Sequence, residues 1–400
     1  MAKKKQPTKP MSLYTILYYL SQSMKYTSVG NFWFENPEES IPYKIFHHLV
    51  FILIYILFLL ETIEGFLNTY PHDLHNDAVT FAIAHSIVIL RMRIIIYHKS
   101  DARQFAHDVI KVCQEYEDDE IRKKQFKKFK NLVIIQYISV IAAMSSFVIE
   151  AIRRMKYGVP FIPVVTYYPG FEDSSYTAFI VRLFILTVQF YFLLNMLSCD
   201  NIAIGYLIIL SYKFMVLKRY FDNLRINYEK NRETLHKDEV TKWFKERYLE
   251  GLNMHRELIR LTKVMNKIFG TVISIQVTES VIVIIQILLR ITLSSDLTFT
   301  AVAMNLLFIF AVYVALALYS LNGGEMTYQA SLLSTSMFHS GWHMLDIEKP
   351  SHHDVRRLIL MGCAQAQRPV VLKAFGVHSL SYETFVFVVR TTYSLFAVLH

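Results

Sequence analysis

Histidine is the residue type in this sequence with the widest range of possible chemistry, and 15 histidines occur. Six of them form close pairs: His47 and His48, His72 and His75, and His352 and His353. Adjacent residues on a helix point about 100° apart, so adjacent histidines do not converge on one metal ion. No hydrolase spacing, glycine-rich phosphate loop or Cys-x-x-Cys accompanies them, and three scattered cysteines make no zinc site. These patterns predict no enzyme, no metal site and no cofactor.

The segment "FVFVVRTTYSLFAVLH" has the second unusual set of polar side chains, because it combines a membrane-type apolar run with hydroxyls and a guanidinium. Residues three and four apart share one helix face. One stripe therefore holds Arg390 or Thr391, Ser394 and Val398, with Leu395 and Leu399 beside it. Such groups are costly against lipid. Two explanations are open: the stripe faces water, or the hydroxyls bond back to their own helix and Arg390 pairs with an acid such as Glu279.

The composition indicates the elements that must position these groups. Of the 400 residues, 53% are hydrophobic and only 19% are charged, which is typical of an integral membrane protein. A membrane span needs about 20 mostly apolar residues. Seven segments qualify, so the predicted fold is all-α with spans at about 45–67, 77–97, 131–152, 176–215, 264–293, 297–320 and 375–399.

The basic residues predict the orientation of these spans. Stretches 1–44, 98–130, 216–263 and 322–373 hold 32 Lys and Arg, whereas the intervening loops hold 3. The positive-inside rule then places the N-terminus in the cytoplasm and the C-terminus outside. This places Arg91 and Arg93 at the cytoplasmic end of the second span, and it disfavours a G-protein-coupled receptor. The anionic inner leaflet explains the net charge of +9 without a nucleic-acid partner.

Long helices are predicted beneath the membrane. Forty residues, the length of the fourth apolar segment, reach about 60 Å, twice the hydrocarbon thickness. This helix should therefore continue into the cytoplasm, and 216–263 should return as the second half of a hairpin. A further cytoplasmic helix within 322–369 should have its N-cap at Ser351 and end before Pro369. A short amphipathic helix near the N-terminus should lie on the membrane. We expect one domain over 1–400.

The C-terminal stretch "AQAQRPVVLKAFGVHSLSYETFVFVVRTTYSLFAVLH" resembles the signature of insect odorant receptors. "YYPGF", Gln189, Asp200 and "LYSLNGGEM" with Trp342 resemble upstream family positions, although the family more often has Cys-Tyr-Tyr-Gly at the last of these. The signature matches are Ala366, Gln367, Arg368, Pro369, Gly376, Ser379, Leu380, Tyr393, Ser394 and Phe396, with Thr392 in place of a Ser.

This resemblance implies an odorant-gated, nonselective cation channel in the plasma membrane of sensory neurons. Four subunits would each contribute the last helix to one central pore, in contact with membrane lipid and permeant cations. The connection between the fourth and fifth spans has about 48 residues, shorter than in the family's co-receptor. A tuning subunit that forms a heterotetramer with the co-receptor is therefore implied. The family's gate position falls on Val398, and the expected pore residues are Thr391, Ser394, Leu395, Val398 and Leu399.

The resemblance also places a pocket for a small volatile molecule in the outer half of spans two, three, four and six. An apolar, aromatic cavity with few hydrogen-bonding groups suits such a ligand, and His85 and Ser146 would be the polar groups. Alternatively, His85 bonds a carbonyl, Glu150 pairs with Arg182, and the aromatic residues only pack helices. The expected pocket residues are Phe81, Ala84, His85, Ile89, Ser146, Ile149, Glu150, Phe179, Ile180, Leu183, Met304 and Phe308.

Two other functional classes fit the same architecture. A gustatory receptor would share it as a homomeric channel, but its C-terminal Thr-Tyr-x5-Gln-Phe signature is not matched here. A non-channel receptor or transporter would have no pore-lining polarity in the last helix, and transporters usually contain a repeat and broken helices.

Overall fold

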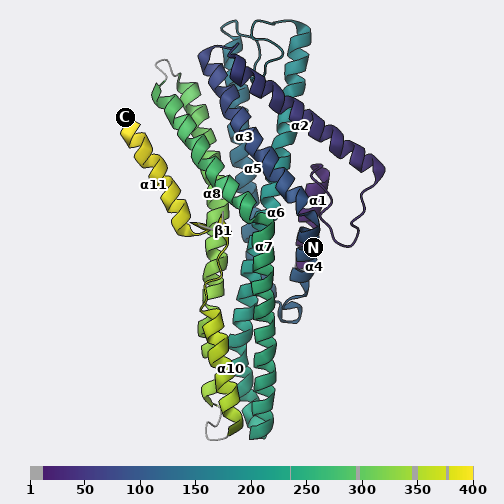
Figure 1. Ribbon diagram of the computed structural model, residues 1–400, viewed down its shortest axis with the longest axis vertical. Coiled ribbons are helices and arrows are strands. Elements are labelled where there is room, and N and C mark those ends of the chain that lie inside the picture. The colour runs from purple at the N-terminus through teal and green to yellow at the C-terminus, as the bar shows by residue number, and fades with distance from the viewer. Residues whose placement is uncertain (1–11, 235, 294–297, 345–349, 375–377, 400) are drawn as a thin grey trace, which may run out of the picture.

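The protein is an elongated bundle of helices, seen in a computed structural model that describes residues 12–234, 236–293, 298–344, 350–374 and 378–399 (Figure 1). Within these residues, six helices are long and apolar enough to cross a membrane. They are α2 (Ile41–Leu67), α3 (His72–Tyr97), α5 (Asp119–Met155), α6 (Tyr176–Thr234), α7 (Lys237–Leu293) and α8 (Phe299–Ser331).

The remaining elements are shorter. They are α1 (Leu13–Tyr26), α4 (Lys99–Lys111), α9 (Leu333–Phe338), α10 (Pro350–Ala366), α11 (Tyr382–Leu399), the 3-10 turns Gln114–Tyr116 and Trp342–Met344, and an antiparallel pair of two-residue strands, β1 (Lys373–Ala374) and β2 (His378–Ser379).

The α6–α7 hairpin determines the length of the molecule. The two helices contain 59 and 57 residues, so each is about 85–90 Å long, nearly three times the hydrocarbon thickness of a bilayer. Aromatic side chains join them at the end remote from α2 and α3: between ring centroids, Tyr248 of α7 lies 5.5 Å from Phe221 of α6, and Phe244 of α7 lies 5.6 Å from Tyr228 of α6. Gly251 permits this approach, because a Cβ there would lie 2.5 Å from the Phe221 ring.

Helix α10 packs beside this hairpin (Figure 1). It begins at Pro350, so Ser351 lies inside the helix and the predicted N-cap is wrong. Proline suits the first turn, where its missing N–H has no partner to lose. The helix ends at Ala366, before Pro369. A Cβ at Gly362 would lie 2.8 Å from Leu252, so this glycine brings α10 close to α7.

Helix α1, the predicted amphipathic helix near the N-terminus, packs on other helices of the chain. Its apolar side faces α6 and α4 and is buried through Leu17, Leu20 and Met24. A Cβ at Gly205 of α6 would lie 2.6 Å from Leu20. The absence of a side chain at this glycine therefore gives Leu20 of α1 the room to pack against α6.

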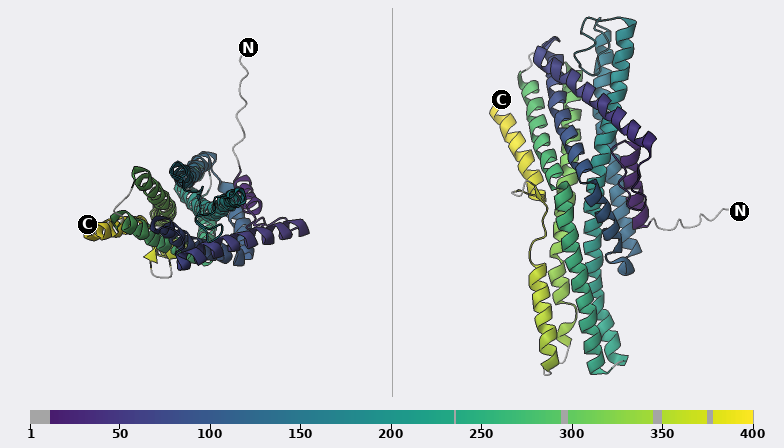
Figure 2. Two further views of the ribbon diagram at one scale, coloured as in Figure 1. Left: turned by 90° about the horizontal axis from the view of Figure 1, so that it is seen from above. Right: turned by 45° about the vertical axis from the view of Figure 1, so that its right-hand side comes forward.

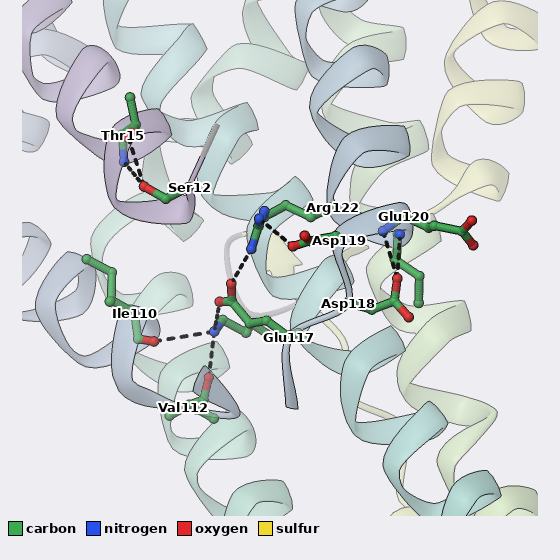
Figure 3. A network of polar contacts seen from close by, with 11 residues as sticks. Ser12, Thr15, Ile110, Val112, Glu117, Asp118, Asp119, Glu120 and Arg122 are labelled. Carbon is green, nitrogen blue, oxygen red and sulfur yellow. Dashed lines mark hydrogen bonds and ion pairs between the residues drawn. The ribbon is translucent and has the colours of Figure 1, made fainter. Parts of the chain in front are cut away.

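The turn between α4 and α5 is held by charged side chains (Figure 3). Glu117 accepts hydrogen bonds of 2.9 Å from both Arg122 and Lys213. Asp118 caps α5 by accepting from the backbone N–H groups of Ile121 and Glu120, and these bonds hold the pKa of its carboxyl below the usual range. The turn thereby fixes the start of α5 against α6.

Helix α11 lies at the edge of the bundle, on the side opposite α1 and α4 (Figure 2). It contacts α7 and α8. It begins at Tyr382, seven residues later than predicted, because β2 precedes it. Gly323 and Gly324 of α8 give the incoming segment room, since Cβ atoms there would lie 2.4 Å from Leu380 and 2.9 Å from Tyr382.

Candidate ligand cavity

A cavity of about 100 Å³ lies among α3, α5, α6, α7 and α8, and most of its wall is apolar. Its aromatic part is a cluster of Phe81, Phe147 and Phe308 from three helices. Their ring centroids lie 5.1 to 6.1 Å apart, the spacing at which aromatic rings attract one another. These rings offer a small ligand a rigid apolar surface.

His85 joins the aromatic cluster to a buried polar chain. Its ring stacks on Phe81 with centroids 5.5 Å apart, and its Nδ1 lies 2.6 Å from Oε2 of Glu61 on α2. A carboxylate can only accept, so Nδ1 carries the proton. The Gln189 NH₂ group can only donate, so Nε2 of His85 accepts from it at 3.0 Å. His85 is therefore held on both sides, by a carboxylate rather than by the carbonyl we considered.

A second polar group forms another part of the wall. Arg91 is 2% exposed and pairs with Asp200 of α6 and with Glu279 of α7, the latter at 3.2 Å. The Tyr319 hydroxyl donates to Asp200 at 2.7 Å, and the Gln136 amide donates at 3.3 Å. Buried charges within a membrane protein persist when they are paired and hydrogen-bonded in this way.

This arrangement adds to one expectation from the sequence and corrects another. Arg91 lies inside the bundle, where it contacts α6 and α7, in the C-terminal part of α3. Glu279 is engaged by Arg91, so the partner suggested for Arg390 is already occupied, and Arg390 itself is exposed. Helical periodicity alone could not identify these partners, because they lie 109 and 188 residues from Arg91.

Four of the twelve expected pocket residues line the cavity: Phe81, Ala84, His85 and Phe308. Met304 is buried against Phe81 and Phe147 just beyond it, and Ile89 packs into the core. Four others face outward from the bundle, at 40 to 62% exposure: Ile149, Phe179, Ile180 and Leu183. Their helix faces point away from the cavity, so we no longer place them in the ligand site.

The two remaining pocket candidates are engaged locally. Ser146 donates to the carbonyl of Ala143 at 2.6 Å within its own helix. Glu150 accepts from Arg153 at 2.7 Å and from Arg154 at 3.0 Å. The Glu150–Arg182 ion pair we considered is wrong, because Arg182 donates instead to the carbonyl of Gly170 at 2.7 Å.

Sequence reasoning missed one wall of the cavity. Helix α7 contributes Gln276, Glu279 and Ser280, and α5 contributes Gln136. The signal was present, because an amide or carboxyl within a membrane-spanning run marks a functional site by default. The prediction from the sequence includes four spans in the wall and omits the fifth, which is α7.

The expected pore residues lie on α11, away from the cavity. Thr391 and Ser394 are exposed, whereas Thr392 is buried with its hydroxyl 2.6 Å from that of Tyr313. The hydroxyls of Thr391 and Ser394 therefore lie on an exposed face of α11, and that of Thr392 lies in the contact with α8. The side chains of Leu395, Val398 and Leu399 lie outside the described residues.

Comparison with known proteins gives the fold and the family. The structure of the insect olfactory receptor OR5 from Machilis hrabei is similar, with a TM-score of 0.77 and 13% sequence identity over 96% of this chain and 97% of that one. A structure of that receptor in complex with eugenol has a TM-score of 0.76 and 12% sequence identity, and the match covers 97% of this chain and 98% of that one.

Sequence comparison is more specific. No curated protein sequence matches the chain. The family model for the 7tm odorant receptors, however, matches residues 73–393, which include every helix that lines the cavity and most of α11. The described part of the chain is a multi-pass, helical membrane protein, and the chain belongs to the 7tm odorant receptor family.

Proposed function

We propose that this chain is the odorant-binding subunit of a ligand-gated, nonselective cation channel. It acts at the plasma membrane of sensory neurons and assembles with a co-receptor chain into a heterotetramer. The cavity carries the proposal, because an aromatic and mostly apolar space with buried hydrogen-bonding groups in its wall suits a small volatile molecule. Eugenol, which the similar Machilis hrabei receptor binds, is a ligand of this kind.

The position of α11 supports the channel part of the proposal. Its contacts within the chain are with α7 and α8, and Thr391 and Ser394 remain exposed on another face. Polar side chains facing lipid would be costly, and a water-filled axis between subunits removes that cost. We propose that α11 is a seventh span, with the N-terminus in the cytoplasm and the C-terminus outside, and that Val398 forms an apolar gate.

The α6–α7 turn supports the assignment as a tuning subunit. Helix α6 ends at Thr234 and α7 begins at Lys237. The hairpin thus has no room for the longer insertion that the resemblance implies for a co-receptor. A homomeric gustatory-type channel remains the second candidate, because it would share the helix arrangement.

Whole-cell currents test the proposal. The chain is expressed with and without an insect olfactory co-receptor, and surface labelling of both chains is measured. A panel of volatile phenols, indoles, alcohols and esters that includes eugenol is applied. We expect a fast cation current only in the co-expressing cells. Equal currents without the co-receptor would favour a homomer, and surface-expressed chains without current would contradict the channel.

A further inference from the structure

Three buried amide groups on the cavity wall bear on which ligands it accepts. Gln136, Gln189 and Gln276 line the cavity and are at most 5% exposed. The side-chain oxygen of each is buried and has no hydrogen-bond partner among the described residues. A buried acceptor without a donor is unfavourable, so three in one cavity wall call for an explanation.

The neighbours of these amides determine whether the NH₂ group or the oxygen forms a hydrogen bond within the protein. Gln136 lies against the Asp200 carboxylate, which can only accept, so its NH₂ faces that carboxylate at 3.3 Å. The Ser280 hydroxyl donates to the Gln276 main-chain carbonyl at 2.9 Å, so toward the Gln276 amide, at 3.4 Å, it can only accept. In both cases the NH₂ group is used and the oxygen remains.

Gln189 follows the same rule through His85. The His85 Nδ1–H donates to Glu61, and the Gln189 NH₂ group, which can only donate, lies 3.0 Å from Nε2 of His85. Nε2 therefore accepts from Gln189. The amide oxygen is again the atom without a partner. Each of the three amides thus directs its NH₂ group to an acceptor in the protein and leaves its oxygen without a donor. The acceptors are Asp200, Ser280 and His85. The cavity wall is consequently rich in hydrogen-bond acceptors.

We propose that the cavity selects small aromatic molecules that carry a hydroxyl or N–H donor, such as phenols and indoles, over analogues in which that donor is methylated. The inference rests on the proposed function, since it names the ligand class of the same cavity. The phenylalanine cluster binds the ring, and one of the three amide oxygens accepts from the donor. A methylated analogue leaves that oxygen without a donor, so it lacks the hydrogen bond that the donor ligand forms and binds more weakly.

Isomeric ligands isolate the donor from ligand size. 4-Methylphenol and anisole share one molecular formula, as do 3-methylindole and 1-methylindole, but only the first of each pair carries a donor. We expect the donor isomer to activate the wild-type channel at a roughly tenfold lower concentration, within the 5- to 150-fold range implied by one buried unpaired acceptor. Because both isomers are applied to the same cells, expression level does not affect the ratio.

Single replacements identify the acceptor. Gln136→Met, Gln189→Met and Gln276→Met each remove one amide at similar volume, and at least one should reduce the ratio to about one. Gln286→Met is the matched control: Gln286 lies on α7, and its side-chain oxygen has no hydrogen-bond partner within the described part of the chain, but it does not line the cavity. It should retain the wild-type ratio. A wild-type ratio near one, or a ratio that survives all three replacements, would overturn the proposal while leaving the channel function intact.

Thermal unfolding of the purified receptor separates the two proposals. If no ligand opens a channel but only the donor isomers raise Tm, the channel proposal fails and the ligand class stands. Equal Tm shifts from both isomers, or no shift from either, would overturn the ligand class as well.

Discussion

The two ends of the bundle are built in opposite ways. At the far end of the α6–α7 hairpin, aromatic rings pack closely against one another and against a glycine. The residues are Phe221, Phe244, Tyr248 and Gly251. At the cavity end, the helices enclose ion pairs, amides and free space. Close packing stabilises the first region, whereas the second encloses polar side chains beside a space that a ligand can occupy. Substitutions should therefore act on stability at one end and on ligand response at the other.

The largest expected effect is a cavity made in the packed end. Phe244 is fully buried and lies 5.6 Å from Tyr228 between ring centroids. Phe244→Ala should cost about 3–5 kcal/mol, which we expect to abolish surface expression and the response to every ligand. Ile226→Ala on the same hairpin, at a side chain that is 61% exposed, is the control. Normal surface labelling of Phe244→Ala would show that this end is not the stabilising region.

The ion-pair network at the cavity end should respond through charge balance. Arg91→Met leaves Asp200 and Glu279 without their cation, at a cost of about 3–5 kcal/mol. Adding Asp200→Asn and Glu279→Gln should restore much of the lost Tm, because the unpaired charges are then removed. Arg93→Met is the neighbouring control, since Arg93 reaches the Tyr55 hydroxyl at 2.9 Å. Equal losses of Tm for the two arginines would contradict a special role for Arg91.

The aromatic cluster should change ligand potency without changing the pore. Phe81→Leu removes ring contacts with Phe147 and His85. Each ring pair contributes about 0.5–1.5 kcal/mol beyond its buried area, so we expect roughly fivefold weaker activation by aromatic ligands. Phe179→Leu, at an outward-facing ring, should behave like wild type. Altered ion selectivity in Phe81→Leu would count against the assignment to a ligand cavity.

The smallest effects are expected on α11, where the two hydroxyls differ in environment. Thr391→Val alters an exposed side chain and should lower single-channel conductance modestly if that face lines water. Thr392→Val removes the 2.6 Å contact with Tyr313 and should alter gating rather than conductance. Val398→Ser should raise the resting current if Val398 closes the pore. Single-channel recording separates these outcomes, and the reverse assignment of the two threonines would reverse the proposed orientation of α11.

The amino-acid sequence was sufficient to predict the membrane class, the approximate positions of the six long helices and the family. These follow from composition, from helix-length apolar runs and from the C-terminal motif, which are all local properties. The sequence also allowed Phe81, His85 and Phe308 to be predicted as cavity residues, because aromatic and ionisable side chains within a span are recognisable candidates for a binding site.

Only the tertiary structure decided which helix faces meet. Ile149 and Phe179 satisfied the same local pattern as Phe81, yet they face outward. The partners of Arg91 and the contribution of α7 to the cavity depend on residues far apart in sequence. Helical periodicity groups residues on a face but does not say what lies opposite that face, because the rotation of each helix is set by packing against its neighbours.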